Sequence, residues 1–270
     1  MPHDGPRNSP DGAPGACIPD AHCHLADLPD PAASAAEAAE AGVGPIAAVS
    51  MGPGDTRALL ALRQAAQGRV LVGAGIHPSR VPELDDVALE AEIAAIEALA
   101  PECDFIGEVG LDFKDAATAS QQDRQRALLD RMLALAGRHR LSVNLHTRRA
   151  DRELLERAER FTRDTGLGAV LHWFTHSRSL ARRCGDAGIW ISAGPSVLID
   201  PKQAEVAKRI AGDFLLVETD SPVVYAGEAA RPSWAARVAG GLAALRGKAP
   251  EDLAETVRRN FARWLGRTRS

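Results

Sequence analysis

Six histidines of the 270-residue chain fall at or just beyond the end of a short apolar run. They are His22, His24, His77, His146, His172 and His176. Two carboxylates hold similar places, because Glu108 lies within the run FIGEVG and Asp220 follows LLVET. Imidazole and carboxylate groups are side chains that bind Zn, Mn, Fe and Mg. These residue types at these places indicate a metal site.

The spacing of His22 and His24 fits a strand, in which residues i and i+2 point to the same face and Cys23 packs on the other side. By itself, the pair fits two exposed loop histidines equally well. Glu108 is more informative, because a carboxylate within an apolar run is costly unless it pairs with an arginine or binds a metal. Asp112 lies in the predicted loop beyond, where it would support a ligand or cap a turn.

Eight short apolar runs alternate with amphipathic stretches of helical periodicity. The predicted strands are 17–21, 45–51, 70–76, 104–110, 142–146, 169–173, 188–193 and 214–219. The clearest helical stretches are 55–67, 84–99, 121–138, 151–163, 201–210, 233–245 and 251–265. This alternation predicts a closed (β/α)8 TIM barrel with the active site at the C-terminal ends of the strands. An open doubly wound sheet is the alternative, but no glycine-rich dinucleotide fingerprint follows the first strand.

Such a barrel would bring the candidate ligands to one mouth. Five strands would deliver His22, His24, Glu108, His146, His172 and Asp220. Six ligands are too many for one tetrahedral metal, and they suit two ions that share a carboxylate. A pair of ions activates a water and steadies the oxygens of a displacement. His77 is needed for neither ion, so it would contact the substrate or support a ligand.

Length and composition favour a single enzyme domain. Apolar residues make up 45% of the chain, and the net charge of −4 argues against a protein that coats nucleic acid non-specifically. The four cysteines include no CxxC pair, which fits reduced thiols in a cytoplasmic protein. No apolar run reaches the ~18–20 residues of a membrane span. Residues 1–16 are rich in proline and glycine and predict a disordered tail, so the folded domain would cover 17–270.

The chain resembles the TatD-like branch of the amidohydrolase superfamily over nearly all of its predicted folded part. The resemblance is carried by DAHCHL at 20–25, GIHP at 75–78, IGEVGLDF at 106–113, LHWF at 171–174 and ETDSP at 218–222. The better-known members of this family are metal-dependent deoxyribonucleases that often act from the 3′ end. The resemblance therefore implies a two-metal hydrolase that cleaves phosphodiester bonds in single-stranded DNA with Mg, Mn or Zn.

The resemblance also implies a role for each residue at the predicted mouth. One metal would be held by His22, His24, Glu108 and Asp220. The second would be held by Glu108, His146 and His172. Glu108 would bridge the ions, and Asp220 would orient or deprotonate the attacking water. The substrate side would include His77, Arg148 and Trp173.

Arginines and aromatic residues near the predicted rim are candidates for nucleic-acid contacts. The arginines are Arg80, Arg148, Arg149, Arg178 and Arg231. Each of them would pair with a phosphate or, as surface arginines more often do, stay solvated. Trp173 and Phe174 would stack on a base, or one of the two would pack beneath the rim. His176 would be a surface residue, a substrate contact or a ligand of a third ion.

The chain departs from the common TatD pattern beside the predicted pocket, with WFTHS at 173–177 in place of CFSG and RPS at 231–233 in place of NEP. HWF at 172–174, with GPSVL at 194–198, resembles the sequence of archaeal TatD-like proteins and of the TatD-like subunits of anti-phage complexes such as QatD. Hydrolysis of an ester or amide, as by a D-aminoacyl-tRNA deacylase, is the alternative activity. A non-catalytic partner subunit is opposed by the complete ligand set. We expect a monomer or small homo-oligomer, with protein partners if the chain serves a defence complex.

Overall fold

The computed structural model describes residues 17–66, 69–174 and 177–266. The predicted tail, 1–16, and the candidate residue His176 lie outside these ranges. No helix of the described residues combines the length and the apolar character that crossing a membrane requires.

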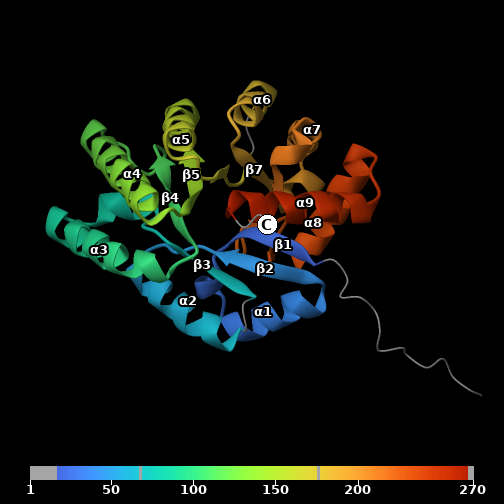
Figure 1. The fold of residues 1–270 in the computed structure, drawn as a ribbon, viewed down its shortest axis with the longest axis horizontal. Coiled ribbons are helices and arrows are strands. Elements are labelled where there is room, and N and C mark those ends of the chain that lie inside the picture. Colours follow the sequence, from blue (N-terminus) through green and yellow to red (C-terminus); the bar gives the residue numbers. More distant parts are fainter. Residues whose placement is uncertain (1–16, 67–68, 175–176, 267–270) are drawn as a thin grey trace, which may run out of the picture.

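Eight parallel strands form one sheet in sequential order, with the helices around its outside (Figure 1), so the predicted (β/α)8 barrel is confirmed. The strands are β1 Ile18–Cys23, β2 Val43–Ala48, β3 Val70–Ala74, β4 Phe105–Asp112, β5 Ser142–Arg148, β6 Ala169–Leu171, β7 Trp190–Ala193 and β8 Leu215–Val217. The helices are α1 Pro31–Glu40, α2 Pro53–Ala65, α3 Asp86–Leu99, α4 Ala119–His139, α5 Asp151–Thr165, α6 Arg178–Asp186, α7 Pro201–Ala207, α8 Trp234–Arg246 and α9 Pro250–Trp264. A small hairpin, β9 Val224–Tyr225 and β10 Glu228–Ala229, follows β8.

The helices begin where local chemistry satisfies their first free N–H groups. Thr118 and Gln121 form a reciprocal capping box at the start of α4. Proline opens α1, α2, α7 and α9, where its missing N–H costs nothing. α1 and α6 were not among the clearest helical stretches of the sequence; the side chains that they bury are small, Ala35 and Ala38 in α1 and Ala181 and Cys184 in α6.

The first and last strands meet at a seam that closes the barrel. The N–H of Asp220, three residues beyond β8, donates to the carbonyl oxygen of His22 in β1 at 3.0 Å. Beside it, the buried Asp20 carboxylate accepts from the Thr219 N–H at 3.0 Å and the Thr219 hydroxyl at 2.6 Å. The seam therefore places His22 next to Asp220, although 198 positions separate them in the sequence.

Several strands differ in length from the prediction. β4 continues through Asp112, so the expectation that Asp112 lies in a loop is wrong. Its ladder with β5 extends to a pairing of Asp112 with Arg148, which keeps both residues in extended backbone. β6 is shorter than predicted and ends at Leu171, so His172 and Trp173 lie beyond it.

Glycines let the backbone of β4 approach its neighbours around Glu108. A Cβ atom at Gly110 would overlap the carbonyl oxygen of His146 in β5. A Cβ atom at Gly75, just beyond β3, would overlap the carbonyl oxygen of Glu108 itself. The sequence IGEVG therefore sets how closely the strands carrying Glu108 and His146 can pack.

The opposite end of the barrel is closed by the C-terminal helix. Trp264 of α9 is fully buried, and its ring lies 5.4 Å from that of Phe105 at the start of β4. Its indole N–H donates to the Val143 carbonyl oxygen at 3.2 Å. This apolar layer leaves the C-terminal ends of the strands as the open face.

We predict that Gly110→Ala destabilises the protein by ~2–3 kcal/mol, because the new methyl group must displace the β5 backbone. Urea unfolding followed by circular dichroism measures the change. The control is Gly240→Ala in α8, where a Cβ meets nothing within 4 Å and alanine should stabilise the helix by ~0.5–1 kcal/mol. Equal effects of the two substitutions would show that the close approach of β4 and β5 is unimportant.

Candidate metal centre

The Glu108 carboxylate lies at the centre of the barrel mouth, with no exposed surface. Its Oε1 atom is 2.7 Å from His172 Nε2 and 2.9 Å from His146 Nδ1. Its Oε2 atom is 3.3 Å from His24 Nε2 and 3.5 Å from His22 Nε2. The two oxygens therefore face two different groups of imidazoles, one on each side of the carboxylate.

The first group gathers at the barrel seam. His22 Nε2 and His24 Nε2 are 3.3 Å apart, and each is 3.5 Å from Asp220 Oδ1. Cys23, between them, is buried in the main apolar cluster, as the alternation of a strand predicts. With Glu108 Oε2, these atoms form a compact group of nitrogen and carboxylate oxygen atoms of the kind that binds a divalent ion.

The second group lies on the other side of Glu108. His146 Nδ1 is 3.1 Å from His172 Nε2, and both face Glu108 Oε1. His77 also points here, since its Nε2 is 3.3 Å from His146 Nδ1 and 3.5 Å from Glu108 Oε1. The other His77 nitrogen, Nδ1, is 2.6 Å from the Ser79 hydroxyl, which fixes the ring with Nε2 inward.

The donor set fits cations rather than a network of neutral groups. Glu108 Oε2 is buried and has no hydrogen-bond partner among the described residues. Burial would raise the pKa of Glu108, but the imidazoles around it, His77 foremost, hold it well below its ordinary value. Burial would lower the pKa of His22 and His146, but the carboxylates outweigh it and raise the two pKa values to about 10 and about 9. At His77 and His172 burial prevails and lowers the pKa, to about 4 for His172. Without a metal, protons supply the positive charge that the carboxylates require.

Outer hydrogen bonds orient two of the histidines. Asn144 accepts from His22 Nδ1 at 2.9 Å through Oδ1, and its Nδ2 donates to the Ala21 carbonyl oxygen. Asp112 Oδ2 is 3.2 Å from His146 Nε2, while its Oδ1 accepts from two backbone N–H groups of the following turn. Asp112 thus makes both of the contacts considered for it, a ligand support and a turn cap. Each contact leaves the inward-facing imidazole nitrogen free to bind an ion.

Glu218 belongs to the centre although the sequence analysis gave it no role. It is fully buried, accepts from the Trp173 N–H at 2.7 Å and from the Ser192 hydroxyl, and lies 3.9 Å from His172 Nδ1. Burial raises its pKa to about 8. The same signal that marked Glu108, a carboxylate at the end of an apolar strand run, was present in LLVE at 215–218.

Two residues at the mouth have left-handed backbone, which residues other than glycine adopt rarely. Asp220 has φ 50° and Trp173 has φ 42°, and each lies just beyond a strand. Such conformations cost about 1 kcal/mol or more and concentrate at functional sites. Here they turn Asp220 towards His22 and His24 and place Trp173 at the pocket edge.

The mouth of the site is partly apolar. Trp173, Met51 and Val224 line it beside the candidate ligands. Phe174, in contrast, is buried in the main core, so one of the two aromatic residues packs beneath the rim as expected. The exposed Val224 belongs to the β9–β10 hairpin, which therefore contributes to the wall of the pocket.

The predicted rim arginines fall into three groups. Arg80 pairs with Glu92, and Arg231 pairs with Glu228 at 3.1 Å, so intramolecular ion pairs already occupy both. Arg148 and Arg149 are exposed at the edge of a pocket that adjoins His146 and His172. Arg178, at the start of α6, lines a separate groove.

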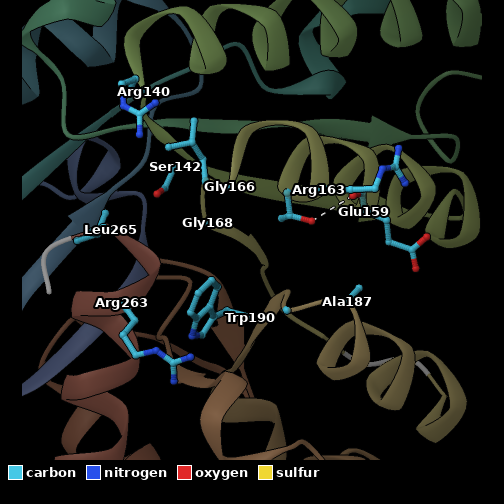
Figure 2. A pocket seen from close by; sticks show the side chains of 14 residues that line it. Arg140, Ser142, Glu159, Arg163, Gly166, Gly168, Ala187, Trp190, Arg263 and Leu265 are labelled. Atoms are coloured by element: carbon cyan, nitrogen blue, oxygen red, sulfur yellow. Dashed lines mark hydrogen bonds between the residues drawn. The ribbon is translucent and has the colours of Figure 1, made fainter.

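A cavity of about 690 Å³ lies at the other end of the barrel and is not the metal centre. Figure 2 shows the side chains that line it. The cavity borders the ends of α4, α5, α6 and α9, whose partial negative charges favour cationic side chains there. Arg140, Arg163 and Arg263 supply them, and the Glu159 carboxylate is held by Arg183 at 2.6 and 2.7 Å. None of the described residues that line this cavity is a histidine.

Comparison with known proteins agrees with the geometry. Residues 19–266 match the family model described as TatD related DNase. The chain belongs to this family. It is therefore a metal-dependent hydrolase of the TatD type, as the motifs predicted.

Three relatives illustrate the likeness. The crystal structure of YjjV, a TatD homologue from Escherichia coli K12, has a TM-score of 0.81 and 31% identity, and the match covers 93% of this chain and 98% of that one. The deoxyribonuclease TATDN3 of Homo sapiens is 31% identical over 227 residues, 78% of this chain and 80% of that protein. The 3′-5′ ssDNA/RNA exonuclease TatD of Citrobacter koseri is 29% identical over 205 residues, which cover 72% of this chain and 76% of that protein. The narrower resemblance to archaeal and anti-phage proteins gains no support from these three and stays a prediction.

We predict that Asp112→Asn weakens metal binding 10–100-fold, because His146 loses its anionic support while the turn keeps its capping oxygen. Competition with a chromogenic chelator measures the affinity. Asp85→Asn, at the exposed N-cap of α3, is the matched control and should bind metal like the wild type. An Asp112→Asn affinity within twofold of the wild type would contradict the support role.

We also predict that metal binding at pH 7.5 releases roughly two protons. The pKa values of His22 and His146 in the metal-free protein are about 10 and about 9, so both imidazoles are protonated at this pH and must lose a proton to bind an ion. Calorimetric titration in buffers with different ionisation enthalpies counts the protons. Heats independent of the buffer would contradict the prediction, and Glu108→Ala serves as the control that lacks the shared ligand.

Proposed function

We propose that the enzyme hydrolyses phosphodiester bonds in single-stranded DNA, from the 3′ end, with two divalent ions. The main support for this proposal is the position of the Glu108 carboxylate, whose two oxygens face two separate groups of imidazoles. His22, His24 and Asp220 would complete one ion's ligands, and His146 and His172 the other's. A pair of ions sharing one carboxylate polarises the scissile group and lowers the pKa of an attacking water.

The side chains around the ions have separate tasks. Burial would raise the pKa of Asp220, but its hydrogen bond with His24 and the charge of His22 hold it below the ordinary value, so it is ionised and able to accept a proton from the water. His77 Nε2 faces the centre and would contact an oxygen of the substrate. Asn144 and Asp112 keep their histidines in place.

The surroundings favour a nucleic-acid substrate over a small ester. Arg148 and Arg149 offer guanidinium donors at the pocket edge, and the Trp173 ring offers a surface for a base. Two relatives point the same way, since one is named a deoxyribonuclease and another a 3′-5′ ssDNA/RNA exonuclease.

We expect Asp220→Asn to lower kcat about 10²–10⁴-fold while the fold is kept, because asparagine tolerates the left-handed backbone and lacks the basic carboxylate. The assay uses 3′-labelled and 5′-labelled single-stranded DNA with Mg, Mn or Zn, beside Glu108→Ala. Early release of the 3′ label, together with stepwise shortening of the 5′-labelled DNA, would support the proposed polarity.

Wild-type turnover by Asp220→Asn would overturn the assignment of Asp220. Absence of DNA cleavage under every metal, together with release of the amino acid from a D-aminoacyl-tRNA in a parallel reaction, would replace the phosphodiesterase proposal with acyl hydrolysis.

A further inference from the structure

A second pocket opens beside the His146–His172 side of the metal centre. It has a volume of about 410 Å³, within the range of small-ligand sites. Besides those two histidines, it is lined by Thr147, Arg148, Arg149, Trp173 and Gln203. It shares both histidines and Trp173 with the mouth of the site, so a ligand there would adjoin the reacting group.

One wall of this pocket offers cationic donors that the protein itself does not neutralise. Arg148 and Arg149 are consecutive and exposed, and neither pairs with a carboxylate within 17–66, 69–174 and 177–266. Arg80 and Arg231, elsewhere on the rim, are both held by glutamates. A guanidinium has N–H donors and no acceptor, so this wall suits a phosphate.

A residue of α7 requires a hydrogen-bond donor from the ligand, whereas the two arginines require an acceptor. The Gln203 Oε1 atom is buried and has no hydrogen-bond partner among the described residues. A buried acceptor without a partner is costly, so a ligand that donates an N–H or O–H to it would bind more tightly. A bare phosphate diester has no such donor.

The backbone around the pocket is strained at two places. Arg149 has φ 60° and Trp173 has φ 42°, and both line the pocket. Residues other than glycine hold such angles only where the surroundings enforce them, and they cluster at ligand sites. Both residues follow shortly after a strand, since β5 ends at Arg148 and β6 ends at Leu171.

We propose that this pocket holds the nucleotide next to the scissile phosphodiester, with its phosphate on Arg148 and Arg149, its base against Trp173 and a base amino group donating to Gln203. A nucleotide is the ligand that combines an anionic acceptor, a flat ring and a donor in one unit. The inference rests on the proposed function and deepens it. The enzyme then requires an oligonucleotide, because a substrate with one phosphodiester leaves the pocket without its phosphate.

The test is a cycle of one substitution in the protein and one in the substrate. Short single-stranded DNA is made with an uncharged methylphosphonate in place of the phosphate on either side of the cleaved bond. For one of the two positions, we expect kcat/KM of the wild type to fall about tenfold, the effect of losing one hydrogen bond to a charged group. Arg149→Ala should fall about tenfold on natural DNA and then lose clearly less than the wild type with the methylphosphonate, because only Arg148 is left to contact the phosphate.

A binding readout that needs no turnover supports the cycle. Fluorescence anisotropy measures the affinity for labelled DNA in EDTA at several salt concentrations. The logarithm of the association constant falls with the logarithm of the salt concentration, and we expect this slope to be less steep by about 0.7 in Arg149→Ala. Arg57→Ala, an exposed arginine of α2, is the matched control and should keep the wild-type slope and the full methylphosphonate effect. Gln203→Leu gives a second variant, expected to raise KM for natural DNA several-fold, in case Arg149→Ala folds poorly.

The outcomes separate the two proposals. If the wild type cleaves DNA but the methylphosphonate lowers the rate equally in the wild type and Arg149→Ala, the pocket assignment is wrong and the phosphodiesterase stands. If the wild type and Glu108→Ala are equally inactive on every DNA with every metal, both proposals fall.

Discussion

The burial of one carboxylate among five imidazoles is the constraint on which the rest of this structure depends. Glu108 has no exposed surface, and His22, His24, His77, His146 and His172 all direct a ring nitrogen towards it. An isolated buried carboxylate would be far too costly to keep ionised, so positive charge must be supplied next to it. Protons do so in the metal-free protein, and divalent ions would do so in the active enzyme.

The scaffold meets this constraint through two devices. Glycines on either side of Glu108 let β3, β4 and β5 pack closely, so that side chains from different strands reach the same carboxylate. The seam between β1 and the segment after β8 brings His22 beside Asp220 through a backbone hydrogen bond. At the opposite end, Trp264 fills the space between the strands, and arginines that suit the helix ends line the cavity there. The apolar packing around Trp264 and the candidate metal centre thus lie at opposite ends of the barrel.

The barrel and its candidate ligands could be predicted because the strand and helix periods differ and because strand ends share one rim. His22, His24, Glu108, His146, His172 and Asp220 needed only this rule to be placed together. This rule could not predict the contacts across the barrel. That Asn144 orients His22, or that Glu218 receives the Trp173 N–H, depends on which strands face each other and how far each one continues. Similarly, Arg80 looked available until the fold placed Glu92 of α3 beside it.

The most direct test of this account is anomalous diffraction from crystals grown with Mn or Zn, with the data collected at the absorption edge of the metal. The account predicts two peaks about 3.5–4 Å apart, one on each side of the Glu108 carboxylate, the first among His22, His24 and Asp220 and the second beside His146 and His172. A single peak, or two peaks that do not share Glu108, would contradict the two-ion centre.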